Sequence, residues 1–237
     1  MVDCGVPIRR LESTMAGLGL HPGQLDFILV THHHRDHTAA LWLKNPLARK
    51  YGIPVAASKQ FWEAWHSGGD PHRDLSDLAL ALDPGQRLAV GDLSIEAFSR
   101  PHDAAGSQGF VLSSLSQSLA VLTDLGHVPD SLVGLLAGIE HVVMEANHDV
   151  EMQLGSQRPQ FLKDRVLGPL GHLSNQQAAG ALARISGPGT KSVLLGHLSL
   201  ECNTPARAAE AVQPHLRAFT RLEVAPPDRP SPWMGSQ

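Results

Sequence analysis

The sequence is poor in the features by which composition alone marks secreted and membrane proteins. It has only 2 cysteines in 237 residues and no CxxC pair, so neither a disulfide framework nor a cysteine-based zinc site is expected. No uninterrupted apolar run reaches the ~18 residues of a membrane helix, and the first residues lack the apolar stretch of a signal peptide. We therefore expect a cytoplasmic protein without a membrane partner.

The charge balance excludes a general electrostatic attraction to nucleic acid. Lys and Arg number 19 against 23 Asp and Glu, a formal net charge of −4. Contact with DNA or RNA would therefore have to come from a local patch or a bound metal. The candidates for a local basic patch are Arg35, Arg158, Lys163 and Arg165. The alternative is that these residues are simply solvated, as exposed basic residues usually are.

Length and composition are typical of one folded domain. The chain is 42% hydrophobic and 18% charged, as in ordinary globular proteins, and 237 residues can bury a full core. We expect a single domain over residues 1–225. Residues 226–237 contain 4 prolines and should form a flexible tail.

The hydrophobic pattern predicts strand–helix units on both sides of an antiparallel meander. The meander covers residues 86–124, and residues 70–86 should be a loop with one helical turn. Strands are predicted at 26–30, 53–57, 141–145, 192–195 and 221–224, and helices at 38–50, 59–66, 129–137, 174–185 and 206–219. Pro46 should kink or break the helix over 38–50 near its end. Ser174 and Thr204 are the expected N-caps of the last two helices. This order indicates an α+β fold with two sheets covered by helices.

Histidine is the residue in excess, with 14 in the chain. Four of them lie in THHHRDH, residues 31–37, directly after an apolar predicted strand. In extended backbone His32 and His34 leave on the same side and can bind one metal ion, while Asp36 and His37 can face a second ion beside it. The plain alternative is a surface run of histidines or the remnant of a purification tag, but the run follows a buried strand, where a site belongs.

Two metal ions would need further ligands, including one carboxylate able to bridge them. The best candidates are single residues that directly follow predicted strands: His102, Asp124 and His197. Imidazole and carboxylate ligands without thiolate suit Zn²⁺, Mn²⁺ or Fe²⁺.

These residues resemble the metallo-β-lactamase superfamily, whose pattern is T-H-x-H-x-D-H at a strand end, then an isolated His, an Asp and a final His. The stretches VDCG, PHDAAGSQGFVL, VLTDLGH, MEANHD, GHLSN and LLGHLS, in this order, are similar to the WalJ/YycJ group of nucleases within it. The resemblance extends from Val2 to about Val224.

The resemblance implies a fold, a metal centre and an activity. The fold is the αβ/βα four-layer sandwich, with two mixed sheets covered by helices. Members of the group usually begin with a further N-terminal hairpin, which we expect to be missing here, because Met1 directly precedes the VDCG stretch. By the resemblance, His32, His34 and His102 bind one metal ion, Asp36, His37 and His197 bind the other, and Asp124 bridges. The implied activity is that of a phosphodiesterase acting as a 5′ to 3′ DNA exonuclease on a strand end, with Asp36 among its catalytic residues.

Further site residues are expected from the segments around these ligands. His148 is a candidate general acid or phosphate ligand, or else a residue that orients a ligand, and His172 is similar. Since His172 leads into a helix N-terminus, His172, Ser174 and Asn175 are expected to hold a substrate phosphate, with simple helix capping as the alternative. Asp3 and Asp103 are expected to orient ligand histidines, although both could cap turns.

Other functions share the ligand pattern. The alternatives are a small-molecule hydrolase of the same fold, such as a cyclic phosphodiesterase, a thioesterase of the glyoxalase II type or a lactonase, and a non-catalytic metal-binding protein. The oligomeric state stays open. The remaining histidines without motif context should be ordinary ones: His21, His66, His72, His127, His141 and His215. The aromatic residues Trp42, Phe61, Trp62 and Trp65 are expected in the core rather than stacked on bases.

Overall fold

The computed structural model describes residues 1–67 and 74–232. They form two compact units. The first unit consists of Met1–Gly91, Ile95–Ser99 and Ala104–Gln108, and the second of Asp92–Ser94, Arg100–Asp103 and Gly109–Gln237. None of the helices within the described residues has the length and apolar character needed to span a bilayer.

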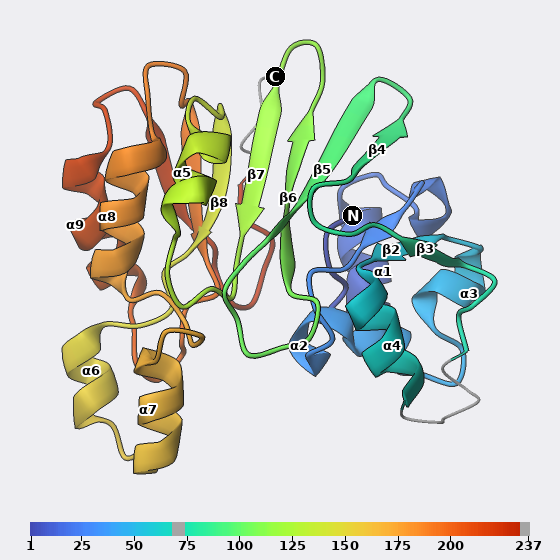
Figure 1. The fold of residues 1–237 in the computed structure, drawn as a ribbon, viewed down its shortest axis with the longest axis horizontal. Coiled ribbons are helices and arrows are strands. Elements are labelled where there is room, and N and C mark those ends of the chain that lie inside the picture. The colour runs from blue at the N-terminus through green and yellow to red at the C-terminus, as the bar shows by residue number, and fades with distance from the viewer. Residues whose placement is uncertain (68–73, 233–237) are drawn as a thin grey trace. The chain divides into compact units, whose positions relative to one another are not determined.

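The first unit is built on a small parallel sheet. Its strands are β1 (Ile28–Leu29), β2 (Val55–Ala57) and β3 (Ala79–Ala81), and they lie in that order. Ile28 and Ala79 both pair with Val55. The helices of this part of the chain, labelled in Figure 1, are α1 (Ile8–Gly17), α2 (Arg35–Thr38), α3 (Leu47–Tyr51) and α4 (Lys59–Ser67). Every residue of β1 and β2 is buried, as expected of parallel strands covered by helices.

A larger sheet has seven strands in the order β10-β9-β8-β7-β6-β5-β4. The strands are β4 (Arg87–Val90), β5 (Leu93–Ser99), β6 (Gln108–Ser113), β7 (Ser118–Leu122), β8 (His141–Glu145), β9 (Ser192–Gly196) and β10 (Arg221–Val224). β6 and β7 are antiparallel, whereas β7, β8, β9 and β10 run parallel. The helices of the second unit, visible in Figure 1, are α5 (Asp130–Leu136), α6 (Val150–Gly155), α7 (Gln160–Leu167), α8 (Asn175–Ile185) and α9 (Pro205–Val212).

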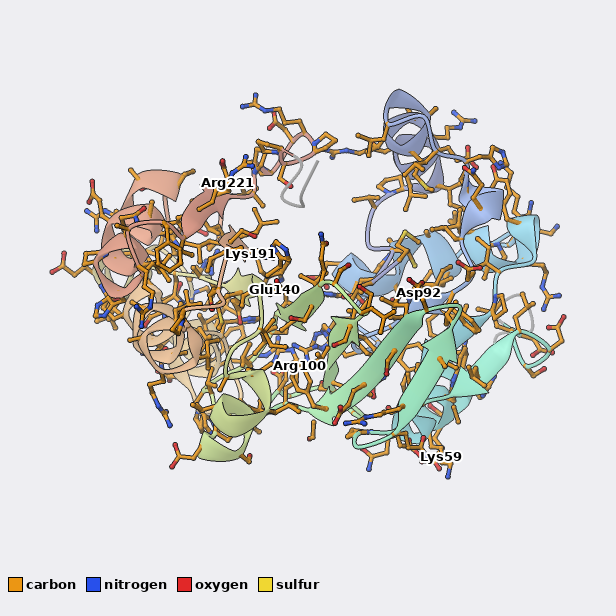
Figure 2. All side chains as sticks on the ribbon, turned by 90° about the horizontal axis from the view of Figure 1, so that it is seen from above. Lys59, Asp92, Arg100, Glu140, Lys191 and Arg221 are labelled. Carbon is orange, nitrogen blue, oxygen red and sulfur yellow. The ribbon has the colours of Figure 1, made fainter. Side chains whose placement is uncertain are left out.

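The parallel strands bring candidate site residues to one edge of this sheet. Asp124 follows β7, Glu145 is the last residue of β8, and His197 follows the last residue of β9. The opposite ends of β8 and β9 carry an ordinary ion pair between Glu140 and Lys191 (Figure 2). The carboxyl ends of parallel strands are the usual place for a site in α/β sheets.

Most of the predicted elements are confirmed, including the meander and the helix N-caps. The Ser174 hydroxyl accepts a hydrogen bond from the Gln177 N–H within a capping box, and the Thr204 hydroxyl accepts one from the Arg207 N–H. The predicted strand over residues 26–30 is shorter, because only Ile28 and Leu29 form β1.

Two predicted helices are wrong in extent. Residues 38–50 do not form one helix: α2 ends at Thr38, a 3-10 turn follows at Ala39–Leu41, and α3 begins only after Pro46. Proline lacks an N–H and cannot continue a helix, which explains the break at Pro46. The predicted helix over 206–219 likewise ends early, at Val212, before a 3-10 turn that contains proline.

The structure also contains elements that were not predicted. The expected loop over residues 70–86 contains β3, and its residues 70–73 lie outside the described part of the chain, together with His72. The helices α1, α6 and α7 were missed. Residues 233–237 of the expected tail are likewise outside the described residues, so its flexibility stays a prediction.

The VDCG stretch packs directly against the histidine motif. The Cys4 N–H donates to the carbonyl oxygen of His37 at 2.8 Å, and the Cys4 carbonyl accepts from the N–H of Ala40 at 3.0 Å. A Cβ atom on Gly5 would lie 1.4 Å from the Asp36 carbonyl oxygen. Only glycine therefore allows this close approach.

Gly5→Ala should destabilise the protein by about 1–3 kcal/mol, because the added methyl group would push the backbone of Asp36 away. The free energy of unfolding in urea measures this. Gly134→Ala is the control: a Cβ there meets nothing within 4 Å, and replacing a helix glycine should stabilise by up to about 1 kcal/mol. Equal stabilities for the two variants would contradict the close approach.

Candidate functional site

In the first unit the histidine motif is anchored by Asp3. The Asp3 N–H donates to the Leu29 carbonyl at 2.8 Å, which places Asp3 beside the end of β1. One carboxylate oxygen accepts from the Thr31 N–H at 2.8 Å. The other accepts from the Thr31 hydroxyl at 2.9 Å and lies 2.7 Å from Nδ1 of His37. Asp3 thus ties the strand end to the histidine six residues further along.

The imidazole rings of this motif converge. His32 and His34 place Nε2 and Nδ1 only 2.9 Å apart, as expected from their spacing. The ring centroids of His32 and His37 are 4.3 Å apart. The other nitrogen of His32, Nδ1, lies 3.0 Å from the Thr31 hydroxyl. Three nitrogen donors are therefore gathered on one side of the motif.

In the second unit the corresponding anchor is Glu145, which is completely buried. Its Oε1 lies 2.7 Å from Nδ1 of His172 and 2.9 Å from Nδ1 of His197. Its Oε2 accepts the Leu125 N–H at 3.0 Å. One carboxylate at the end of β8 therefore orients two imidazole rings and also holds the turn after Asp124.

Asp124 lies within this cluster. Its Oδ1 is 3.4 Å from Nε2 of His197 and 3.8 Å from Nδ1 of His172. Single ligand atoms of Asp124, Glu145, His172 and His197 all lie within 4.8 Å of one another. His102 approaches the same region, with its ring centroid 5.3 Å from that of His172 and its Nδ1 3.3 Å from the Gly171 carbonyl oxygen.

The surroundings of Glu145 and His102 keep each in the protonation state that a metal requires. Burial alone would raise the pKa of Glu145, but the hydrogen bonds from His172 and His197 outweigh it and hold that pKa below its usual value. Burial lowers the pKa of His102 to about 4, although the Asp124 carboxylate opposes the shift. At neutral pH Glu145 is therefore ionised and the His102 ring is neutral.

The backbone is unusual at three candidate residues. Among the described residues, left-handed φ angles outside glycine occur at Asp3 (53°), Asp124 (58°) and His197 (56°). Such a conformation is uncommon outside glycine, although Asp and His adopt it more often than most residues, and it tends to occur at functional sites, where the surroundings fix it. The Asn147 amide contributes at His197, where it donates to the carbonyl oxygen at 2.9 Å.

The donor set fits divalent metal ions. Nδ1 of His37 and of His197 faces a carboxylate, which turns Nε2 on the other side of the ring outward as the ligand atom. Histidines that bind metals are typically oriented in this way. The imidazole and carboxylate donors, with no cysteine among them, match the ions expected from the sequence.

Ser174 and Asn175 both have partners at the start of α8. The Ser174 hydroxyl is occupied as the N-cap of α8. Asn175 is buried and exchanges two side-chain hydrogen bonds with Asn203, at 2.9 and 2.8 Å. Its N–H donates to the carbonyl oxygen of His148. These two side chains therefore have partners within the chain, and their contact with a substrate phosphate stays a prediction.

His148 is buried, with 1% of its surface exposed, and neither ring nitrogen has a hydrogen-bond partner among the described residues. Burial lowers its pKa to about 4, so the ring is neutral at pH 7. Asp103 lies 3.4 Å from Nε2 of His102 through Oδ1, and its Oδ2 accepts from Arg165. Its carboxylate is thus shared between a candidate ligand and a basic side chain.

The other residues singled out in the sequence lie in the core, at the surface or in ion pairs. Phe61, Trp62 and Trp65 are buried in the core of the first unit, as expected. His127 is exposed, and its Nδ1 lies 3.1 Å from the Pro169 carbonyl oxygen. Two of the basic residues proposed for a local patch make ion pairs instead: Arg158 with Glu201 and Arg165 with Asp103.

Glu145 is one of the site residues that the sequence analysis does not predict. Its signal was present, since it ends a predicted strand within MEANHD, in the same position that singled out Asp124 and His197. Glutamate is rarely fully buried, so a single glutamate at a strand end does not by itself indicate a site.

The chain is similar to known proteins over most of its length. The beta-lactamase superfamily domain matches residues 1–198. The exodeoxyribonuclease WalJ of Streptococcus pneumoniae is 36% identical over 203 residues, 86% of this chain and 74% of that protein. The exodeoxyribonuclease YycJ of Bacillus anthracis is 35% identical over 214 residues, 90% of this chain and 78% of that protein.

Solved structures show the same fold. The crystal structure of the metallo-β-lactamase-fold protein YhfI from Bacillus subtilis aligns with a TM-score of 0.67 at 17% identity, over 94% of this chain and 83% of that one. The predicted α+β class, with two sheets and helices, is thereby confirmed.

The burial of His148 should make the metal-free protein sensitive to acid. Above about pH 6.5 the ring is neutral in both the folded and the unfolded chain. As the pH falls from about 6.5 towards the folded pKa of about 4, the unfolded chain takes up a proton that the folded chain does not, so the free energy of unfolding decreases. Urea unfolding at pH 7 and pH 5 measures the decrease.

His148→Gln should reduce this pH dependence, whereas His215→Gln, at an exposed position, should leave it unchanged. An identical pH dependence in His148→Gln and the unaltered protein would contradict the assignment.

Proposed function

The chain belongs to the beta-lactamase superfamily and is a metal-dependent hydrolase with the metallo-β-lactamase fold, and on that premise we propose that it is a phosphodiesterase that degrades DNA from a strand end, in the 5′ to 3′ direction. The observation that carries the proposal is the identity to two exodeoxyribonucleases over most of the chain. The fully buried Glu145 supports a functional site at this place, because a carboxylate is an unfavourable choice for a residue that only fills the core.

We propose that the chain binds two divalent metal ions, which are Zn²⁺, Mn²⁺ or Fe²⁺. In this assignment His32, His34 and His102 bind one ion, Asp36, His37 and His197 bind the other, and Asp124 bridges them. The anchoring of His37 by Asp3 and of His197 by Glu145 supports it within each unit. A pair of such ions supplies a hydroxide at neutral pH and stabilises the attacking and leaving oxygens of a phosphodiester.

His172 is the residue we assign to protonation of the leaving oxygen. Its Nδ1 is held by the Glu145 carboxylate at 2.7 Å, so Nε2 is the nitrogen that can exchange a proton with substrate. About a fifth of its side chain is exposed, at 20%, whereas the neutral and buried His148 cannot meet a substrate directly. His148 is better suited to packing beneath the site.

The exonuclease proposal is tested by digesting 5′-phosphorylated single-stranded DNA with the metal-loaded chain. Label at the 5′ end should appear in mononucleotides before label at the 3′ end does. Asp124→Asn should abolish cleavage because it removes the charge of the bridging ligand, whereas Asp130→Asn, at an exposed residue paired with Arg184, should cleave normally. A metal-loaded chain that leaves DNA intact but hydrolyses a small phosphodiester would overturn the choice of substrate.

His172→Gln should lower kcat by about 10²- to 10⁴-fold, the usual contribution of a general acid, while two metal ions stay bound. His127→Gln is the matched control at an exposed histidine outside the cluster and should keep full activity. Steady-state kinetics and metal analysis measure both. Loss of a metal ion in His172→Gln would make His172 a ligand instead, and unchanged kcat would remove it from the reaction.

A further inference from the structure

Arg100 carries a charge that the proposed chemistry does not use. Its side chain is completely buried, at 0% exposed, in the segment that leads from β5 to His102 (Figure 2). An ionised guanidinium is rarely buried unless it is paired and hydrogen-bonded. A buried Arg100 therefore requires a partner that accepts hydrogen bonds from its guanidinium.

That partner is Asp124. Nη1 of Arg100 donates a hydrogen bond to the backbone carbonyl oxygen of Asp124 and lies 3.6 Å from its Oδ2. The backbone of Asp124 has the left-handed φ angle of 58°. One side chain therefore contacts both the main chain and the carboxylate of a residue in a strained conformation.

The two residues after Asp124 are held by the segment that contains Arg100 and by Glu145. The Gly126 N–H donates to the carbonyl oxygen of Pro101, the residue after Arg100, at 3.0 Å. The Leu125 N–H donates to Glu145 at 3.0 Å. Consecutive residues of the turn are thus held by the segment before His102 on one side and by the end of β8 on the other.

His197 is the other candidate ligand of this unit with a left-handed φ angle, and a neutral side chain donates to its carbonyl oxygen. Its carbonyl oxygen accepts from the amide of Asn147 at 2.9 Å. At Asp124 the donor is the guanidinium cation of Arg100. A cation suits this place because a carbonyl oxygen and a carboxylate lie together there, and a planar guanidinium can donate to two acceptors at once.

We propose that Arg100 is a positioning residue for the metal centre: it holds Asp124 in the left-handed conformation and so sets the direction of the carboxylate relative to His102. This inference rests on the proposed role of Asp124 as a metal ligand. It does not depend on the identity of the substrate.

The test is the affinity of metal-stripped protein for Mn²⁺, measured by calorimetry, in Arg100→Met, Arg100→Gln and Arg100→Lys. Arg100→Met removes both contacts and should raise the Kd of at least one ion by about 10- to 100-fold, as other changes behind metal ligands do. Arg100→Gln keeps a donor for the carbonyl oxygen and Arg100→Lys keeps the charge, so both should lie between Arg100→Met and the unaltered protein.

Leu136→Ala controls for a general loss of stability, because Leu136 is fully buried at the end of α5, which leads into the start of β8, whereas the candidate ligands of this unit follow the carboxyl ends of strands. Its thermal midpoint should fall while its Kd for Mn²⁺ stays unchanged. If Arg100→Met does not fold, the comparison of Arg100→Gln and Arg100→Lys with Leu136→Ala decides.

Unchanged Kd values in the folded Arg100 variants would overturn the inference, as would an equal loss of affinity in Leu136→Ala. An unaltered chain that binds no Mn²⁺ would overturn this inference and the metal assignment together. A metal-loaded chain without activity on DNA would overturn only the exonuclease proposal.

Discussion

A divalent metal ion binds an imidazole ring only when the ring is neutral and turned with one nitrogen towards the ion, and two carboxylates impose this orientation here. In the first unit the Asp3 carboxylate is hydrogen-bonded to Nδ1 of His37. In the second unit the Glu145 carboxylate is hydrogen-bonded to Nδ1 of both His172 and His197. Glu145 ends a buried strand, so the parallel sheet itself fixes its position. The proposed chemistry depends on these two side chains as much as on the ligands.

The same constraint accounts for where the backbone is strained. Within the described residues, Asp3, Asp124 and His197 are the non-glycine residues with left-handed φ angles, and each directly follows or adjoins a strand of its unit. A strand end that continued in regular conformation would carry its side chain away from the edge of the sheet. Turning the backbone sharply at that point keeps the carboxylate or imidazole at the edge, and the buried side chains of Arg100 and Asn147 stabilise the turn.

The sequence predicted what depends on short-range pattern. Alternating apolar residues located the meander, and Ser174 and Thr204 located two helix starts, because both signals lie within a few residues of the feature they mark. The ligand candidates His102, Asp124 and His197 were found from their places after predicted strands. Arg100 and Glu145 were missed, because their value comes from contacts with residues 24 to 52 positions away. The helices α6 and α7 were missed because their exposed faces carry apolar residues such as Leu154 and Phe161.

The distribution of charge bears on how DNA would be held. Proteins that grip long stretches of nucleic acid present many unpaired cations, each neutralising a phosphate. Here the basic residues of the α7 region are engaged within the chain: Arg158 with Glu201, Lys163 with the Leu154 carbonyl, and Arg165 with Asp103. With a net charge of −4 as well, the proposed metal ions would supply much of the attraction for phosphate. Such attraction acts on the few phosphates near the reacting bond, which suits an enzyme that engages a strand end rather than a long duplex.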